Sequence, residues 1–432
     1  MNQNRHRSHT GCWTCKSARR RCDRARPACE ACHRRGLVCE GYAVRLRWGS
    51  GIASRGRFRG ALLPLEDAVP ARLPGRQRDL LRNAQQLFTD FSTTGIQLLH
   101  ATPTASPLLP LLPQLCRHSE ALYNVCVALQ ALLSAPDDTT RFLHCFDAAL
   151  TRFRAELAST SNSRNADGLP DATFTAGLLL CTIGSMHGLP WTMHLQGMYS
   201  LLRIPPTPSS PDMPFSSHLV EVMGVMDLPG LVLARQTSCL HVWRRHCFGR
   251  TGVEPVSGLP RSLLDLYSST FHYADRDSRS AETAEAALWA WTGEGGNPLQ
   301  YRLWEVHRLA AILNIRQHSV SVPSVPSVSS DTLAMRALDN LDALRQSCAD
   351  SQAGSSVMNA TSFPLFVVGM EIARLSSPPE LRDIIRQCFH AQPQQVDAGL
   401  HVLLALLERV WAGDPVDIEQ FLRQKNMEIR LI

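Results

Sequence analysis

Residues 12–39 have the sequence CWTCKSARRRCDRARPACEACHRRGLVC, and this stretch decides how the N-terminal part of the chain folds. It contains the spacing C-x2-C-x6-C twice, with six residues between the two copies. Each copy offers three thiolates, one fewer than tetrahedral zinc requires. Six sulfurs fill the eight ligand positions of two zinc ions only when two sulfurs bridge both metals. The spacing therefore predicts a binuclear zinc cluster with an internal pseudo-twofold axis. The predicted ligands are Cys12, Cys15, Cys22, Cys29, Cys32 and Cys39.

A single zinc ion is the alternative interpretation of these cysteines. The two C-x2-C pairs could hold one metal, which would leave Cys22 and Cys39 without a role. Cys22 and Cys39 have the same offset in the two halves of the stretch, so the two-zinc interpretation is favoured.

The first 25 residues are polar and basic, unlike a secretory signal peptide. Spaced cysteines in a reducing compartment bind metal more often than they form disulfides.

The basic residues of the chain are concentrated at its start. Residues 1–60 hold 15 Lys and Arg against three acids, whereas the rest of the chain holds 29 basic and 35 acidic side chains. Two Zn²⁺ and six thiolates together carry a charge of −2, which the surrounding arginines outweigh. A basic metal-binding module joined to a mildly acidic body is typical of a protein that binds a polyanion such as DNA.

The cysteine stretch resembles the fungal Zn2Cys6 (binuclear zinc cluster) family over residues 11–40, without a gap. Residues 15–22, CKSARRRC, match the basic first helix of that family, and Pro27 matches the proline of the loop that leads into the second half. The resemblance implies that Cys12 and Cys29 bridge the two zinc ions. It also implies that the partner is double-stranded DNA.

In this family the end of the first short helix enters the major groove and recognises a CGG triplet. The resemblance places the base contact on Arg19, where lysine is more usual, and Ala18 replaces a basic residue often found beside it. The triplet is therefore expected, and its flanking preference is left open. An arginine fork can contact guanine O6 and N7 through two hydrogen bonds. The residues expected to contact DNA are Lys16, Arg19, Arg20, Arg21, Arg24, Arg34 and Arg35.

The sequence divides into three parts. Residues 8–45 are the predicted DNA-binding domain, residues 46–78 are a linker with many Gly, Arg and Pro, and residues 79–432 are a helical regulatory domain. No a/d heptads continue over three turns in the linker, so the pattern does not support a dimerising coiled coil there. A monomer on one triplet and a homodimer both stay open.

Helical periodicity runs through the third part, and alternating strand patterns are nearly absent from it. The predicted fold class is mainly α: a small zinc cluster, a linker and a large all-helical domain. Loops rich in Pro, Ser and Gly separate the helices. The predicted helical segments are 79–91, 121–133, 141–157, 173–181, 191–202, 217–248, 282–292, 299–318, 331–348, 364–374, 380–391 and 398–411.

This body resembles the fungal-specific transcription factor domain that accompanies many Zn2Cys6 modules. The matching pieces are WTMHLQG at 191–197, GLP at 258–260, FPLFVVG at 363–369 and LERVW at 407–411. The resemblance implies a regulatory role with no defined catalysis.

The sequence contains no motif that would suggest an enzyme. The chain lacks a P-loop, GxSxG, HExxH or GxGxxG in its required context. Some His and Cys residues lie close enough in sequence to imitate a catalytic or metal site. They are Cys181, His187, His194, Cys239, His241, His246 and Cys247. Apolar residues interleave with them, and buried His and Cys are more often packing residues. The chain is therefore not expected to be an enzyme.

The sequence predicts a nuclear protein without a membrane segment, since its most apolar stretch, 175–189, is shorter than the roughly 20 residues that a bilayer needs. The resemblance implies a transcription factor that binds CGG-type elements and contacts the transcription machinery. Its expected role is that of a pathway-specific activator of a secondary-metabolite gene cluster. A repressor, or a broader regulator with the same module, is the alternative.

Overall fold

The computed structural model contains two compact units, Met1–Leu73 and Pro74–Ile432, which are described separately. The described residues are 11–18, 20–26, 28–39, 41–42, 74–102, 106–134, 138–162, 169–202, 214–270, 278–318, 328–349, 355–374, 379–393 and 397–432. The predicted linker lies outside the described residues as far as residue 73, and so do Arg19 and Pro27.

The N-terminal unit contains two short helices, α1 (Trp13–Ser17) and α2 (Glu30–His33). Each begins after a cysteine whose Sγ accepts a hydrogen bond from a backbone N–H three residues later: Cys12 caps α1 and Cys29 caps α2. Asp23 adds a second cap, because its carboxylate accepts hydrogen bonds from the first two N–H groups of α2. The free N–H groups at a helix start favour such anionic partners. The repeated sequence therefore forms a repeated local structure.

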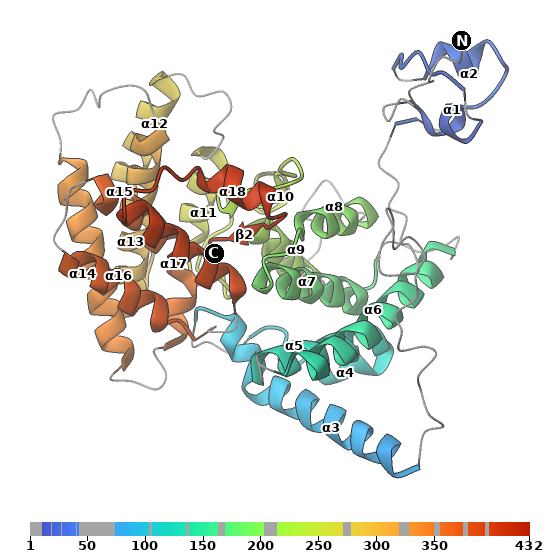
Figure 1. Cartoon of the computed structure of the whole chain (residues 1–432), viewed down its shortest axis with the longest axis horizontal. Coiled ribbons are helices and arrows are strands. Elements are labelled where there is room, and N and C mark those ends of the chain that lie inside the picture. Colours follow the sequence, from blue (N-terminus) through green and yellow to red (C-terminus); the bar gives the residue numbers. More distant parts are fainter. Residues whose placement is uncertain are drawn as a thin grey trace. The chain divides into compact units, whose positions relative to one another are not determined.

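The second unit is built from helices and one short sheet (Figure 1). Its first group of helices is α3 (Pro74–Thr93), η1 (Gly95–Leu99), α4 (Leu112–His118), α5 (Glu120–Ser134), α6 (Thr139–Asn162), α7 (Asp171–Met186), α8 (Thr192–Leu201) and α9 (Pro214–Met226). Its second group is α10 (Val242–His246), α11 (Arg261–Thr270), α12 (Ser278–Ala290), α13 (Pro298–His318), α14 (Ser330–Ala349), η3 (Ser355–Ala360), α15 (Ser362–Arg374), α16 (Pro379–His390), α17 (Ala398–Trp411) and α18 (Ile418–Gln424).

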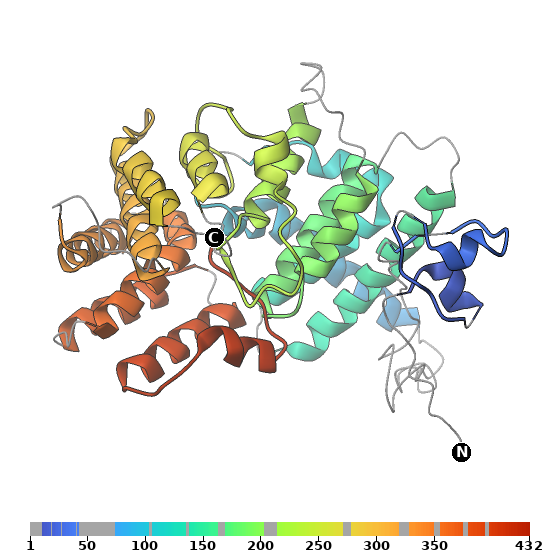
Figure 2. The ribbon, with the colours of Figure 1, turned by 90° about the horizontal axis from the view of Figure 1, so that it is seen from above.

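Each group surrounds a hydrophobic core of its own. In the first core, α5 is central: ten of its 15 residues are buried, and α3, α6 and α7 pack against it. In the second core α13 is central, and α12, α14 and α15 pack against it. A helix that is apolar on nearly every side is stable only when neighbours cover those sides. Figure 2 shows the two groups lying side by side within the second unit.

A two-stranded sheet and one buried carboxylate hold the two groups together. β1 (Val232–Leu233) pairs antiparallel with β2 (Ile429–Arg430). Glu428, directly before β2, is fully buried. Its carboxylate accepts hydrogen bonds from the N–H groups of Trp191 and Thr192, both at 2.8 Å, and from the N–H of Gln236 at 2.6 Å. These bonds attach the segment of β2 to the start of α8.

The prediction of continuous helix over 217–248 is wrong. α9 ends well before α10 begins, and β1 lies between them. Pro229 cannot continue the helix, and Gly230 has a φ of 73° in the turn that follows, a left-handed conformation that glycine adopts without strain. The buried carboxylate of Asp227 then accepts hydrogen bonds from the N–H groups of Leu240 and Val242, which fixes the intervening loop.

The other predicted helical segments all fall on helices of the structure, which confirms a mainly α fold. Among the described residues of the second unit, the α-helices α4, α11 and α18 and the 3-10 helices η1 and η3 were not predicted. None of the described helices is long and apolar enough to cross a membrane.

Candidate zinc centre and nucleic-acid interface

Four cysteine sulfurs lie at the spacing that a tetrahedral zinc site requires. The Sγ atom of Cys12 is 3.5 Å from that of Cys29 and 3.7 Å from that of Cys32. The Sγ atom of Cys15 is 3.8 Å from that of Cys29 and 3.7 Å from that of Cys32. Tetrahedral Zn–S bonds of about 2.3 Å put neighbouring sulfurs about 3.8 Å apart. These four sulfurs are therefore close enough together to act as zinc ligands.

The other two cysteines, Cys22 and Cys39, have equivalent positions in the two halves of the module. The N–H of Cys12 donates to Sγ of Cys22, and the N–H of Cys29 donates to Sγ of Cys39, both at 3.4 Å. Burial alone would raise the pKa of Cys22, but hydrogen bonds to its sulfur, first among them the bond from the N–H of Cys12, outweigh burial and lower the pKa to about 6. The bond from Cys29 also lowers the pKa of Cys39. Both side chains thus favour the thiolate form that binds zinc.

Cys12 and Cys29 lie at the centre of the sulfur cluster. Both side chains are completely buried. The sulfur of Cys29 lies within 4.8 Å of those of Cys12, Cys15, Cys22 and Cys32, and its N–H donates to Sγ of Cys39. Burial raises the pKa of Cys12 to about 12 and also raises that of Cys29. Ionisation of these thiols requires a nearby positive charge, which zinc ions supply. The donor set therefore fits a binuclear zinc centre.

Asp23 is a residue of this site that the sequence analysis did not single out. Its carboxylate lies near the sulfurs of Cys22 and Cys29. The oxygens already accept hydrogen bonds from the N–H groups of Ala31 at 2.9 Å and Glu30 at 3.0 Å. The bond from Ala31 is the main cause that lowers the pKa of Asp23 to about 2. Asp23 therefore positions α2. The only feature of the sequence that could have identified Asp23 is that it is an isolated acid among basic residues.

Tyr42 is a second residue that the sequence analysis missed. Its hydroxyl donates to the carbonyl oxygen of Ala25 at 2.8 Å and lies 3.7 Å from Sγ of Cys22. The N–H of Trp13 donates to the carbonyl oxygen of Gly41 at 3.1 Å, which brings this segment back to α1. An aromatic residue three positions after the last cysteine is the signal that could have identified it.

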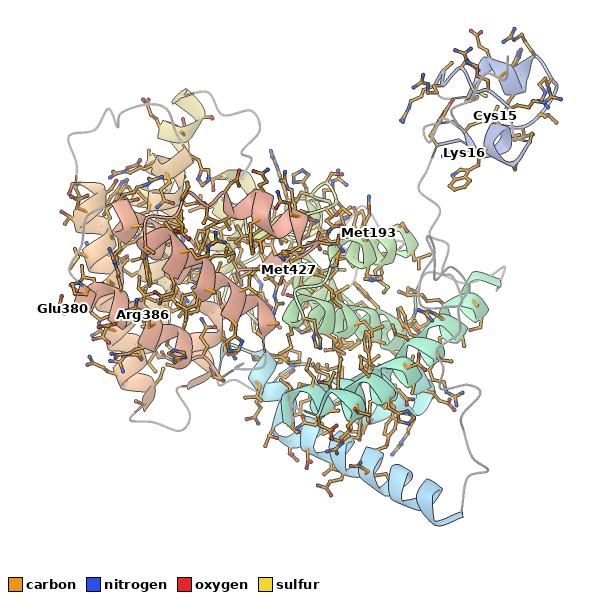
Figure 3. All side chains as sticks on the ribbon, in the orientation of Figure 1. Cys15, Lys16, Met193, Glu380, Arg386 and Met427 are labelled. Atoms are coloured by element: carbon orange, nitrogen blue, oxygen red, sulfur yellow. The ribbon has the colours of Figure 1, made fainter. Side chains whose placement is uncertain are left out.

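Exposed basic side chains surround the buried sulfurs. Six of the seven predicted DNA contacts are among the described residues, and all six are exposed: Lys16, Arg20, Arg21, Arg24, Arg34 and Arg35. Lys16 follows Cys15 in α1, and Figure 3 labels both side chains. The Nζ atom of Lys16 lies 4.8 Å from the centre of the Trp13 ring. Such a cationic surface suits phosphate groups. Arg19, the predicted base contact, lies outside the described residues.

The His and Cys residues of the body that could imitate a site have packing or hydrogen-bonding partners. Cys181 is completely buried in the first core. The ring of His187 stacks on Phe142 with 4.8 Å between centroids. The hydroxyl of Tyr199 lies 3.1 Å from Nε2 of His246. Across the part of the chain that the structure describes, groups able to hold a metal ion occur only in the N-terminal unit.

Several curated proteins are similar to short segments of the chain. Arginine metabolism regulation protein II of Saccharomyces cerevisiae is 43% identical over 44 residues, which are 10% of this chain and 5% of that protein. Pestheic acid cluster transcriptional regulator 3 of Pestalotiopsis fici is 26% identical over 107 residues, 23% of this chain and 19% of that protein. The ustiloxin B cluster transcription factor ustR of Aspergillus flavus is 40% identical over 42 residues, 10% of this chain and 7% of that protein. The matches thus span less than a fifth of the length of these relatives. No solved structure matches the chain.

Two domain families match the chain over longer ranges. The fungal Zn(2)-Cys(6) binuclear cluster domain matches residues 10–49, which include all six cysteines, and this domain implies two zinc ions and DNA binding. The fungal specific transcription factor domain matches residues 86–420, from α3 to α18. Neither is an enzyme family, and a transcription factor family implies action in the nucleus. The chain therefore belongs to the fungal transcription factors that join a Zn(2)-Cys(6) cluster to a fungal specific transcription factor domain.

Proposed function

We propose that the six cysteines hold two Zn²⁺ ions and that Cys12 and Cys29 are the bridging ligands. The observation that supports this assignment is the central place of Cys29, whose sulfur lies within 4.8 Å of four other cysteine sulfurs and whose N–H donates to the fifth. The remaining ligands are Cys15, Cys22, Cys32 and Cys39. Zinc neutralises the thiolates and fixes the two halves of the module against each other.

The basic surface over this cluster binds double-stranded DNA and recognises a CGG triplet. Arg19 directly follows the C-terminal cap of α1, residue Ala18, and makes the base contact. Lys16, Arg20, Arg21, Arg24, Arg34 and Arg35 contact phosphates and set the orientation of the module. Titration of the chain with duplexes that carry one or two triplets separates a monomer from a homodimer on DNA.

The proposed role is activation of a gene cluster that makes a secondary metabolite, through contacts between the helical body and the transcription machinery. The names of two similar proteins, which refer to the pestheic acid and ustiloxin B clusters, support this role. A repressor or a broader metabolic regulator is the second candidate. It is favoured by the similarity to a protein whose name refers to arginine metabolism.

The transcript profile of the native host tests this role when the chain is overexpressed. The matched control is Cys29→Ser, which removes a bridging ligand and with it the folded DNA-binding module. The proposal predicts that a contiguous block of biosynthetic genes rises with the wild-type chain and stays at its basal level with the variant. Scattered changes, or a fall of transcripts, would favour the second candidate.

A further inference from the structure

A cavity of about 110 Å³ lies where the two hydrophobic cores of the second unit meet. Ile96 and Leu178 of the first core line one side of it. Ala101 and Val225 of the second core line the other side. Ligand sites occur preferentially at such seams between packed groups, and most of their wall is apolar.

Hydrogen bonds across the seam hold the walls of the cavity in place. The Nδ2 atom of Asn359, in η3, donates to the carbonyl oxygens of Leu98 at 2.8 Å and His100 at 3.2 Å. The N–H of Ala101 donates to the carbonyl oxygen of Val256 at 2.7 Å. The segments come from widely separated parts of the chain, so these bonds fix the shape of the cavity before any ligand arrives.

The charge of the wall is unbalanced. Arg430, in β2, is the only Lys or Arg among the lining residues, and none of these residues has an Asp or Glu side chain. Its guanidinium makes no ion pair or hydrogen bond with any residue that the structure describes. Burial lowers the pKa of Arg430, although the residue as a whole is only partly buried, so an anionic partner would stabilise its charge. Asp397 interacts with it at longer range, but uses a carboxylate oxygen to cap α17 through the N–H of Leu400 at 3.2 Å.

The two imidazoles in the wall add little charge. Burial lowers the pKa of both His100 and His218, so both rings are neutral near pH 7. The Nδ1–H of His100 is already used by the carbonyl oxygen of Ile96 at 2.8 Å. Glu254 faces these rings, and its carboxylate accepts hydrogen bonds from the N–H groups of Val256 and Ser257. The wall therefore presents one cation in largely aliphatic surroundings.

We infer that this cavity binds a small apolar molecule with a single carboxylate, which pairs with Arg430 while the hydrocarbon part fills the seam between the two cores. A cavity of about 150 Å³ accepts benzene, so at about 110 Å³ this cavity suits a short branched chain rather than an aromatic ring. The planar guanidinium can bind a carboxylate through two parallel hydrogen bonds. A ligand at this place contacts both cores and stabilises their packing against each other. This inference does not depend on the DNA-binding proposal.

The test uses the full zinc-loaded chain and three probes of nearly equal shape: isobutyrate, neutral isobutyramide and cationic isobutylamine. Ligand-observed NMR titration measures their binding. Isobutyrate is expected to bind at least about tenfold more tightly than the other two, because its hydrogen bonds to Arg430 are charge-assisted. Arg430→Gln should abolish this preference and Arg430→Lys should keep part of it. Val222→Phe places a larger side chain in the cavity wall and should weaken the binding of all three probes.

Arg423→Gln is the matched control, because Arg423 is exposed in α18 and pairs with Glu419 away from the cavity lining. It should leave the binding of all three probes unchanged. Circular dichroism and thermal unfolding first establish that each variant is folded. Equal binding of the three probes, binding of none, or isobutyrate binding that survives both Arg430→Gln and Val222→Phe would each overturn the inference.

Discussion

Single residues in the N-terminal unit have separate tasks that follow from their chemistry. Cys29 caps α2 and its sulfur also lies within 4.8 Å of four other cysteine sulfurs, whereas Asp23 acts through hydrogen bonds to backbone N–H groups. The basic side chains lie outside this buried cluster. The six cysteines could be predicted as ligands from their spacing alone, because tetrahedral zinc needs four ligands and the repeated spacing supplies a matching set of sulfurs. Asp23 and Tyr42 could not, because they act through backbone groups that a sequence motif does not display.

Two arginine substitutions separate base recognition from phosphate binding. Arg19→Ala should abolish the preference for CGG over scrambled duplexes while salt-dependent binding persists. Arg34→Ala should weaken binding to all duplexes alike and lower the salt slope by about 1. Fluorescence anisotropy with matched duplexes at several salt concentrations measures both effects. If Arg19→Ala keeps full selectivity, another residue makes the base contact.

His307 should make the stability of the second unit depend on pH. The ring is completely buried, and its Nε2–H donates to the carbonyl oxygen of Ala360 at 2.7 Å. Burial lowers the pKa of His307 from 6.5 to about 4, so the folded state resists protonation. The unfolded chain takes up the proton first, and the free energy of unfolding should fall by roughly 3 kcal/mol between pH 6.5 and pH 4, with no further loss from this group below.

Urea unfolding of His307→Gln at several pH values tests this expectation. In the variant, the free energy of unfolding should fall less steeply between pH 6.5 and pH 4 than in the wild type, whatever the overall stability of the variant. His144→Gln, at an exposed position, serves as the control and should keep the wild-type slope. An unchanged slope in His307→Gln would contradict the explanation.

At the scale of helices and strands, prediction succeeds where a local pattern controls the structure. α5 and α13 are long stretches rich in apolar residues, without glycine or internal proline, so their helical character is visible in the sequence. Within 217–248, Pro229-Gly230 is a local turn signal that the prediction did not use. The pairing of β1 with a strand near residue 430 leaves no local pattern. The cavity was not predicted for the same reason, since its walls come from distant segments.

The attachment of β2 to α8 should depend strongly on Glu428. Glu428→Ala leaves buried N–H groups of Trp191 and Thr192 without their acceptor. We expect a loss of about 4 kcal/mol in the free energy of unfolding. Glu428→Gln keeps one acceptor and should lose less. Glu380→Ala, at an exposed position at the start of α16 (Figure 3), should change stability by less than about 0.5 kcal/mol. Urea unfolding compares the three, and an equal loss in all would contradict this assignment.

At the scale of the whole molecule, the chain combines a small metal-dependent unit with a large unit that has hydrophobic cores of its own. A unit of such small size needs its metal to fold, whereas a large one does not. Zinc chelation should therefore abolish DNA binding and leave most of the helical circular dichroism signal. Loss of both together would show that the second unit also depends on the metal.

Native mass spectrometry of the zinc-loaded chain tests the central claim most directly, because it counts the metal ions on each protein molecule. The account predicts two zinc ions per wild-type chain, and a loss of bound zinc in both Cys22→Ser and Cys39→Ser. One zinc ion per wild-type chain, unchanged in both variants, would contradict the binuclear cluster and assign the metal to Cys12, Cys15, Cys29 and Cys32 alone.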